Sequence, residues 1–165
     1  MATISLVRVD SSLVHGQVVT GWIMITHVDR VIVIDDQTRA DPFLTQINQL
    51  ASPIPCEVMS VDEAVSAWKE NRFGNRGNLL VLFQYIRTAC AAYKAGIRFP
   101  LLQLGNIGGG SGRKTIVESI ALTEEEAHLL NGCYKEGMKI EFCPHAENKR
   151  IPWQPTISQV YPSVN

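Results

Sequence analysis

The chain has 165 residues, of which 45% are hydrophobic and 19% charged, and a formal net charge of −1. This is the size and composition of one soluble globular domain, and the near-neutral charge excludes a general attraction to nucleic acid or anionic lipid. No apolar run reaches the roughly 18 residues of a membrane-spanning helix, and we expect no secretory signal peptide. The four cysteines form no CxxC pair and are expected to be small buried hydrophobes, which favours a cytoplasmic protein.

Strand-like and helix-like segments alternate along the chain. Short apolar runs predict strands at 4–9, 30–34, 56–59, 79–83, 101–104 and 139–142, the last alternating like a partly exposed edge strand. Apolar positions at helical spacing predict helices at 16–26, at 40–51, from 61 through 68, at 86–95 and from 124 to about 137. Capping boxes at Ser60–Glu63 and Thr123–Glu126 begin two of them, and Gly96 follows the end of another.

The remaining segments are expected to be irregular or exposed. Ile116–Leu122 should be extended, and the proline-containing chain beyond Pro144 is expected to be a surface tail. No repeat or linker divides the chain, so residues 1–165 are expected to form one domain. The strand–helix alternation predicts an α/β fold: a three-layer, open, mostly parallel sheet with helices on both faces and an antiparallel edge strand.

A polar turn holding His15 separates the first strand from the first helix. In open α/β sheets, ligands gather in loops that follow the carboxyl ends of strands. A neutral imidazole has a lone pair that can attack phosphorus or accept a proton. The backbone amides of Gly16, Gln17 and Val18 would open the helix without intrahelical partners and could hold an anion, and Gly16 leaves room for a phosphoryl group.

Two charged residues at the end of the first strand could assist this histidine. Asp10, or a backbone carbonyl of the same loop, could orient the imidazole through its second nitrogen, and Arg8 could supply positive charge. These features favour phosphoryl handling by His15, but a structural loop histidine and a general base of a small-molecule hydrolase remain open. The hydrolase lacks a companion nucleophile in the sequence.

The glycine-rich stretch 105–114 does not fit a nucleotide-binding loop. A phosphate-binding loop places glycine directly before Lys-Ser or Lys-Thr and then a helix, whereas Arg113 precedes Lys114 here and the following residues favour a strand. We expect a wide turn from which Arg113 and Lys114 could contact a partner. Asp35 and Asp36 end a strand without clustered histidine or cysteine, so no metal site is expected.

The segment Arg8–Val18 (RVDSSLVHGQV), with Trp22 one turn later, resembles the signature of a known family. It is similar to the Arg-Ile-Asp-Asp-Arg-Leu-Ile-His-Gly-Gln-Val run of IIB components of the mannose/fructose/sorbose family of the bacterial phosphotransferase system. The segments Val31–Asp36, Leu104–Gly109 and Ser119–Glu126 also look like family segments, so the resemblance extends along nearly the whole chain.

The resemblance implies a phosphocarrier that needs no cofactor. His15 would accept a phosphoryl group on Nδ1 from a phosphohistidine of the IIA component and pass it to a sugar held by the IIC and IID membrane components. The protein would then be cytoplasmic and peripherally associated with the transporter, and family members often self-associate.

The sequence departs from the family run at two positions next to the histidine. Ser11 stands where the second acidic residue usually lies, and Ser12 stands where the family has arginine, whose charge a hydroxyl cannot supply. Arg8, Arg113 or Lys114 would have to compensate. Gln84 and Tyr85 lie where a neighbouring active-site loop is expected. The loss of the arginine leaves open a regulatory phosphoprotein that no longer serves a transporter.

Overall fold

The computed structural model describes residues 2–165, without the side chain of Gln17. Its main sheet has the strand order β3-β2-β4-β1-β5-β8-β9, and a separate pair is formed by β6 and β7. The strands are β1 Thr3–Val9, β2 Arg30–Ile34, β3 Cys56–Met59, β4 Asn78–Phe83, β5 Leu101–Leu104, β6 Lys114–Val117, β7 Ile120–Leu122, β8 Lys139–Phe142 and β9 Ile151–Pro152. The helices are α1 Gly16–Thr26, α2 Asp36–Ala40, α3 Pro42–Ala51, α4 Val61–Asn71, α5 Ile86–Lys94, α6 Glu124–Lys135 and α7 Trp153–Val160.

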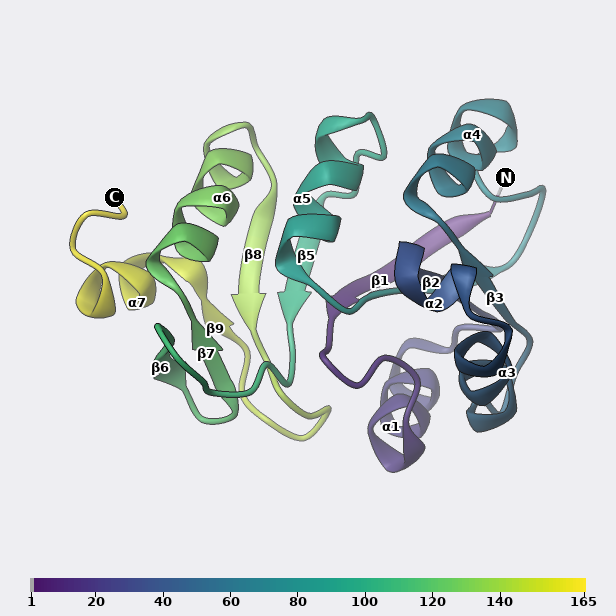
Figure 1. The fold of residues 1–165 in the computed structure, drawn as a ribbon, viewed down its shortest axis with the longest axis horizontal. Coiled ribbons are helices and arrows are strands. Elements are labelled where there is room, and N and C mark those ends of the chain that lie inside the picture. The colour runs from purple at the N-terminus through teal and green to yellow at the C-terminus, as the bar shows by residue number, and fades with distance from the viewer. Residues whose placement is uncertain (1) are drawn as a thin grey trace.

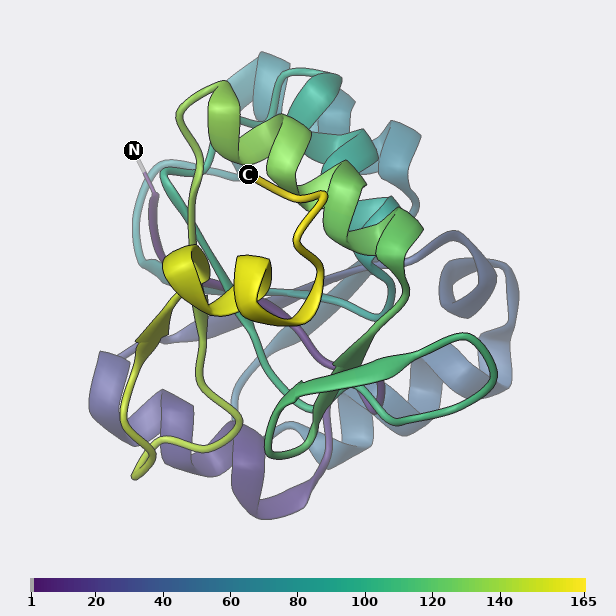
Figure 2. The same ribbon diagram turned by 90° about the vertical axis from the view of Figure 1, so that its left-hand side faces the viewer.

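Helices lie on both sides of the sheet, which confirms the predicted α/β class. Helices α4, α5 and α6 lie on one side, and α1 and α3 lie on the other (Figure 1). The view turned by 90° shows the sheet between these two layers (Figure 2). The apolar side chains of β2 alternate between the two faces of the sheet. Ile32 and Ile34 belong to one buried cluster, whereas Val31 and Val33 belong to the other.

The order of the strands places the end of β1 at a change of direction. From β1 the chain moves to β2 and β3, and it then returns through β4 to β5 on the other side of β1. Parallel crossovers are right-handed, so a reversal of direction also moves the connecting helices to the opposite face. The carboxyl end of β1 therefore lies where the connections diverge, between its neighbours β4 and β5.

The helix ends follow the local signals of the sequence. Both capping boxes are present, with Ser60 accepting from the Glu63 amide and Thr123 from the Glu126 amide. Gly96 lies two residues beyond the end of α5, directly after the C-cap residue Ala95, and has a φ of 120°, a conformation that favours glycine. The two capping boxes and the glycine after α5 are thus confirmed.

The single helix predicted at 40–51 is wrong, because the segment holds the end of α2 and the whole of α3. Asp41 lies between them in an extended conformation, and its carboxylate accepts from the amides of Phe43 and Leu44 at 2.9 and 3.3 Å. A side chain that caps the next helix ends the previous one. Asp35 caps α2 in the same way, through the amide of Thr38 at 3.0 Å.

The antiparallel edge strand exists, but it is not the segment expected. Strand β8 pairs in parallel with β5, and the edge is formed by β9, which pairs antiparallel with β8. The segment 116–122 is not one extended run, since β6 and β7 form an antiparallel hairpin. The alternating burial of β8 therefore reflects one face that is less covered than the other, not an edge position.

The chain beyond Pro144 is not a surface tail, which corrects the expectation. Trp153 is 1% exposed and stacks on Phe142, with ring centroids 5.6 Å apart. Ile157 and Val164 are fully buried, and the Tyr161 hydroxyl donates to the Leu122 carbonyl at 2.7 Å. The prolines end and bend this segment, but its apolar residues complete the core.

The sequence also raised expectations about membrane-spanning helices and about the cysteines. No helix among residues 2–165 has the length and apolar character needed to cross a bilayer. The cysteines are free thiols, with Cys90, Cys133 and Cys143 buried and Cys56 partly exposed.

Replacing Ile157 with alanine tests whether α7 belongs to the core. Because the side chain is fully buried, we expect the free energy of unfolding to fall by about 2–4 kcal/mol. The exposed Gln159 on the same helix is the matched control, and its change to alanine should stay within about 0.5 kcal/mol. Urea denaturation measures both, and equal effects would show that α7 does not contribute as part of the core.

Candidate functional site

His15 lies in the loop between β1 and α1, at the carboxyl edge of the sheet. The side chains of Leu13 and Val14 are each 4% exposed and anchor this loop in the core, whereas His15 is half-buried. Leu13 adopts a φ of 54°, in the left-handed region. This turn of the backbone brings His15, in extended conformation, to the N-cap position of α1.

The imidazole stands beside the amino end of α1. His15 makes no side-chain cap bond, and the first turn of α1 contains no acidic residue. The backbone amides of Gly16, Gln17 and Val18 therefore remain the positive end of a helix, next to a nucleophilic ring. A Cβ atom at Gly16 would meet nothing within 4 Å, so the space expected there exists. The Gln17 side chain lies outside the described part of the chain.

The ring is oriented by a carbonyl, not by a carboxylate. Nδ1 of His15 lies 3.5 Å from the Leu13 carbonyl oxygen, at the limit of a hydrogen bond. The Asp10 carboxylate, proposed from the sequence as a catalytic partner, instead accepts from the Ser12 amide at 3.0 Å and from Asn106 Nδ2 at 3.2 Å. Asp10 therefore holds the loop in the described structure, and of the two orienting partners expected from the sequence it is the backbone carbonyl that lies beside the ring.

Neighbouring segments hold the loop through its backbone. Gln84, which follows β4, donates from Nε2 to the Ser11 carbonyl at 3.1 Å. Asn106, after β5, accepts the Ser11 amide with its own carbonyl at 2.9 Å. On the other side, Asn48 of α3 accepts the Val14 amide at Oδ1, at 3.1 Å. Three separate elements therefore determine where His15 is presented.

Arg8 does not offer its charge to the site, which corrects the sequence-based expectation. Its guanidinium is 1% exposed and donates to Gln103 Oε1 and the Cys143 carbonyl, both at 2.7 Å, and to the Pro144 carbonyl. It also pairs with Asp10 at 3.3 Å. Burial lowers the pKa of Arg8, and the Asp10 carboxylate partly offsets this effect. All of these contacts are internal, so Arg8 is a structural cation.

The two cations of the glycine-rich loop are also engaged at the β6–β7 hairpin. Arg113 donates to the Ala121 carbonyl and pairs with Glu126, both at 2.9 Å. Lys114 places its ammonium 5.2 Å from the centre of the Tyr161 ring. Neither residue contacts the His15 loop in the described structure, so the compensation expected from them is not seen. Ser12 is exposed in the loop that precedes His15. The positive charge of the family arginine is therefore missing at this position.

The other candidate residues have local structural roles. Asp36 accepts the Val61 amide at 2.8 Å, and within residues 2–165 no group of three or more His, Cys, Asp or Glu side chains is placed to hold a metal ion. His27 ends α1, and His128 contacts the Ser163 hydroxyl at 3.1 Å. Trp22 is buried and lies under Arg8, with the guanidinium carbon 5.0 Å from the ring centre.

Three residues that hold the site were not identified from the sequence. Asn48 and Gln103 lie among apolar residues of a helix and a strand, and Asn106 lies in the glycine-rich loop. A polar side chain in a buried strand needs a partner. The presence of Arg8 and Gln103 in two apolar strands could therefore have predicted that they pair. Asn48 carried no such signal, because the exposure of its helix neighbours depends on tertiary structure.

The chain is similar to known proteins over nearly its whole length. The model of the sorbose subfamily IIB component of the phosphotransferase system matches residues 4–162. The fructose-specific EIIB component of Bacillus subtilis is 25% identical over 86% of this chain and 87% of its own length. The mannose-specific EIIAB component of Escherichia coli is 22% identical over 95% of this chain, which spans only 49% of that relative.

Solved structures agree with the family match. The crystal structure of manxB from Thermoanaerobacter tengcongensis superposes with a TM-score of 0.90, is 26% identical and is covered over 98% of both chains. The family match identifies the chain as a component of a phosphotransferase system. The chain belongs to the sorbose subfamily of IIB components of that system.

Replacing Gly105 with alanine tests the frame around Arg8. The added Cβ would fall against the Arg8 guanidinium, closer than real atoms approach, although the backbone of Gly105 is compatible with alanine. Displacing a buried, paired arginine should lower the free energy of unfolding by about 2–4 kcal/mol. Gly108, where a Cβ would meet nothing within 4 Å, is the matched control. Urea denaturation should separate the two variants, and equal stabilities would contradict the role assigned to Arg8.

Proposed function

We propose that His15 is the phosphoryl-carrying residue of this IIB component. The observation that supports it most strongly is the position of the imidazole, half-buried on a loop and next to the uncapped amino end of α1. This geometry supplies a nucleophile and an anion site at one place. The family membership of the chain makes phosphotransfer the chemistry to which such a site is suited.

In the proposed reaction Nδ1 of His15 attacks the phosphorus of a phosphohistidine on a IIA component. The new N–P bond forms as the bond to the donor nitrogen breaks, and the donor imidazole keeps that electron pair. Nδ1 faces the Leu13 carbonyl at 3.5 Å, and in this contact Nδ1 carries the ring proton, because a carbonyl oxygen only accepts. Before attack this proton must pass through solvent to Nε2, and the ring must turn so that the lone pair left on Nδ1 faces the donor. The donor bond is already activated, so positioning and charge stabilisation are sufficient.

The residues around His15 then divide into two groups. The amides of Gly16, Gln17 and Val18 receive the negative charge of the phosphoryl group at the helix end, and Ser12 lies exposed beside them. Asp10, Asn48, Gln84 and Asn106 position the loop through the hydrogen bonds described above. The phosphoryl group would pass onward to a sugar held by IIC and IID membrane components, to which the protein binds peripherally.

Labelling tests the proposal directly. Incubation with the general phosphotransferase proteins, phosphoenolpyruvate and a IIA component of this family should place one acid-labile phosphate on the chain. His15→Ala should remain unlabelled, whereas His145→Ala should be labelled like the wild type. An unlabelled wild type, or a labelled His15→Ala, would refute the assignment.

A second function is favoured by one specific observation. Ser12 replaces the family arginine, and Arg8, Arg113 and Lys114 are all engaged in other contacts. A site with less positive charge could accept phosphate yet transfer it slowly to sugar. The protein would then be a regulatory phosphoprotein that reports the phosphorylation state of the system.

The substitution Ser12→Arg distinguishes the two functions. A guanidinium beside His15 would stabilise the transferring phosphoryl group, and we expect sugar phosphorylation to rise at least about tenfold if the native site is deficient. The measurement is the rate of sugar phosphate formation with the cognate membrane components. Full activity of the unaltered protein, with no gain from the arginine, would exclude the regulatory alternative.

A further inference from the structure

The apolar face of α3 points to solvent, not into the core. Phe43, Ile47 and Leu50 share one stripe of this helix and are 67%, 44% and 77% exposed. The buried residue of α3 is instead a polar one, Asn48. A surface helix normally buries its apolar stripe and exposes its polar side chains. Helix α3 has the opposite arrangement, so its outer face is built for contact with another molecule.

Helix α1, which lies on the same side of the sheet as α3 (Figure 1), also exposes apolar side chains. Met24 and Ile25 are 70% and 53% exposed. Together with the stripe on α3 they make up five of the six exposed large hydrophobic side chains in residues 2–165, and the sixth, Tyr134, belongs to α6. Such concentration on two neighbouring helices marks an interaction site and not scattered surface residues.

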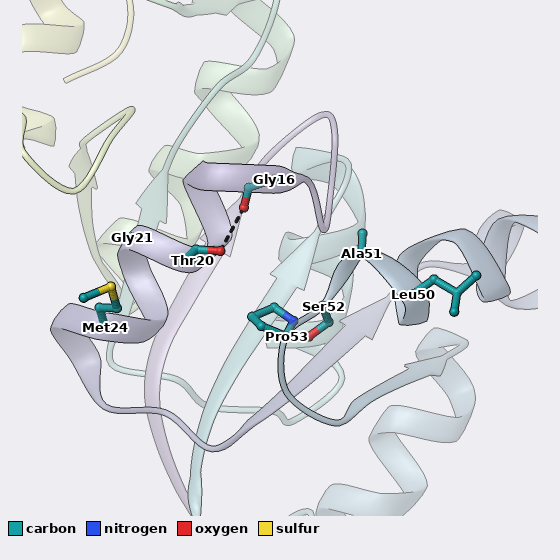
Figure 3. A pocket seen from close by; sticks show the side chains of 8 residues that line it. All are labelled: Gly16, Thr20, Gly21, Met24, Leu50, Ala51, Ser52 and Pro53. Atoms are coloured by element: carbon teal, nitrogen blue, oxygen red, sulfur yellow. Dashed lines mark hydrogen bonds between the residues drawn. The ribbon is translucent and has the colours of Figure 1, made fainter.

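A groove connects the two helices. It has a volume of about 480 Å³, and its lining comes from α1 on one side and from the end of α3 on the other, with Ser52 and Pro53 between them (Figure 3). The full lining is Gly16, Thr20, Gly21, Met24, Leu50, Ala51, Ser52 and Pro53. None of these residues is charged, so the groove suits an apolar protein segment and not a phosphate or an anionic lipid.

The groove is continuous with the phosphoryl site. Gly16, at one end of its lining, directly follows His15 and provides the first amide of α1. From inside α3, Asn48 holds the Val14 amide, which directly precedes His15. A protein that brings its own phosphohistidine to His15 must cover the amino end of α1, and the α1–α3 groove extends from that end.

We propose that the α1–α3 groove is the docking surface for the phosphoryl donor protein, whose contact region would be apolar beside its phosphohistidine. This inference rests on the proposed function of His15. A second copy of this chain is a poorer occupant, because a stable dimer through this face would cover the surroundings of His15 and hinder both steps of transfer. Contacts in the groove would change the affinity for the donor protein and not the rate of the chemical step, because the exposed apolar side chains of the groove are not part of His15.

Polar substitutions in the groove test the proposal. Met24→Gln and Leu50→Gln change side chains that are already exposed, so both variants should fold. With a phosphorylated IIA protein that labels the wild type, we expect the KM for that donor to rise about tenfold, with kcat little changed. Tyr134→Gln is the matched control for loss of an exposed large side chain and should behave like the wild type.

A small phosphoryl donor separates docking from chemistry. Potassium phosphoramidate needs no protein contact, so it should label the wild type and both groove variants at the same rate. Failure of the wild type with both donors would refute the function of His15 itself. Normal KM values in both groove variants would overturn only the docking proposal.

Two further measurements exclude the other occupants. If sedimentation shows a wild-type dimer that the groove variants convert to monomer, the face belongs to a second copy and the proposal is wrong. If the variants accept phosphate normally but lose only transfer to sugar, the face belongs to the membrane acceptor and the proposal is again wrong. A raised donor KM in monomeric, folded variants supports it.

Discussion

The buried guanidinium of Arg8 is the interaction on which the site depends. It connects the end of β1 with Gln103 of β5 and with the carbonyls of Cys143 and Pro144 after β8. A buried charge is tolerated only when its hydrogen bonds and its counter-charge are in place. Asp10 supplies the counter-charge and uses its other oxygen to hold the Ser12 amide. The Arg8–Asp10 ion pair thus also holds the start of the His15 loop in place.

This use of Arg8 has a chemical consequence at the surface. The Arg8 guanidinium is 1% exposed and bonded inside the protein, so it makes no direct contact with a phosphoryl group at the surface. With Arg113 and Lys114 engaged at the hairpin, the amides at the start of α1 are the electropositive feature next to His15 in the described structure. Partial charges of a helix end are weaker than a guanidinium, so in the proposed transfer a larger share of the stabilisation would fall to groups of the docked partner.

The sequence predicted those features that depend on local or periodic signals. Strand β2 and helix α1 were found at their observed bounds, because continuous and helical apolar patterns reflect burial between layers. The position of His15 followed from a general property of parallel sheets. The break at Asp41 was missed, since an aspartate inside an apolar pattern does not reveal whether its carboxylate caps a helix. Proline content likewise concealed the burial of α7, which depends on contacts with β8 and α6 that only the fold creates.

Helix α3 shows most clearly why an apolar pattern does not define a core. Its apolar stripe has the spacing expected of a buried face, yet the side of the helix that faces inward carries Asn48. This side chain accepts the Val14 amide and donates to the Leu44 carbonyl. An unpaired amide beside the nucleophile would be unfavourable and would loosen the loop. The polar residue must therefore face inward. Leaving Leu50 and its neighbours in solvent lowers solubility without stabilising the monomer, so their retention is best explained by a contact made during transfer.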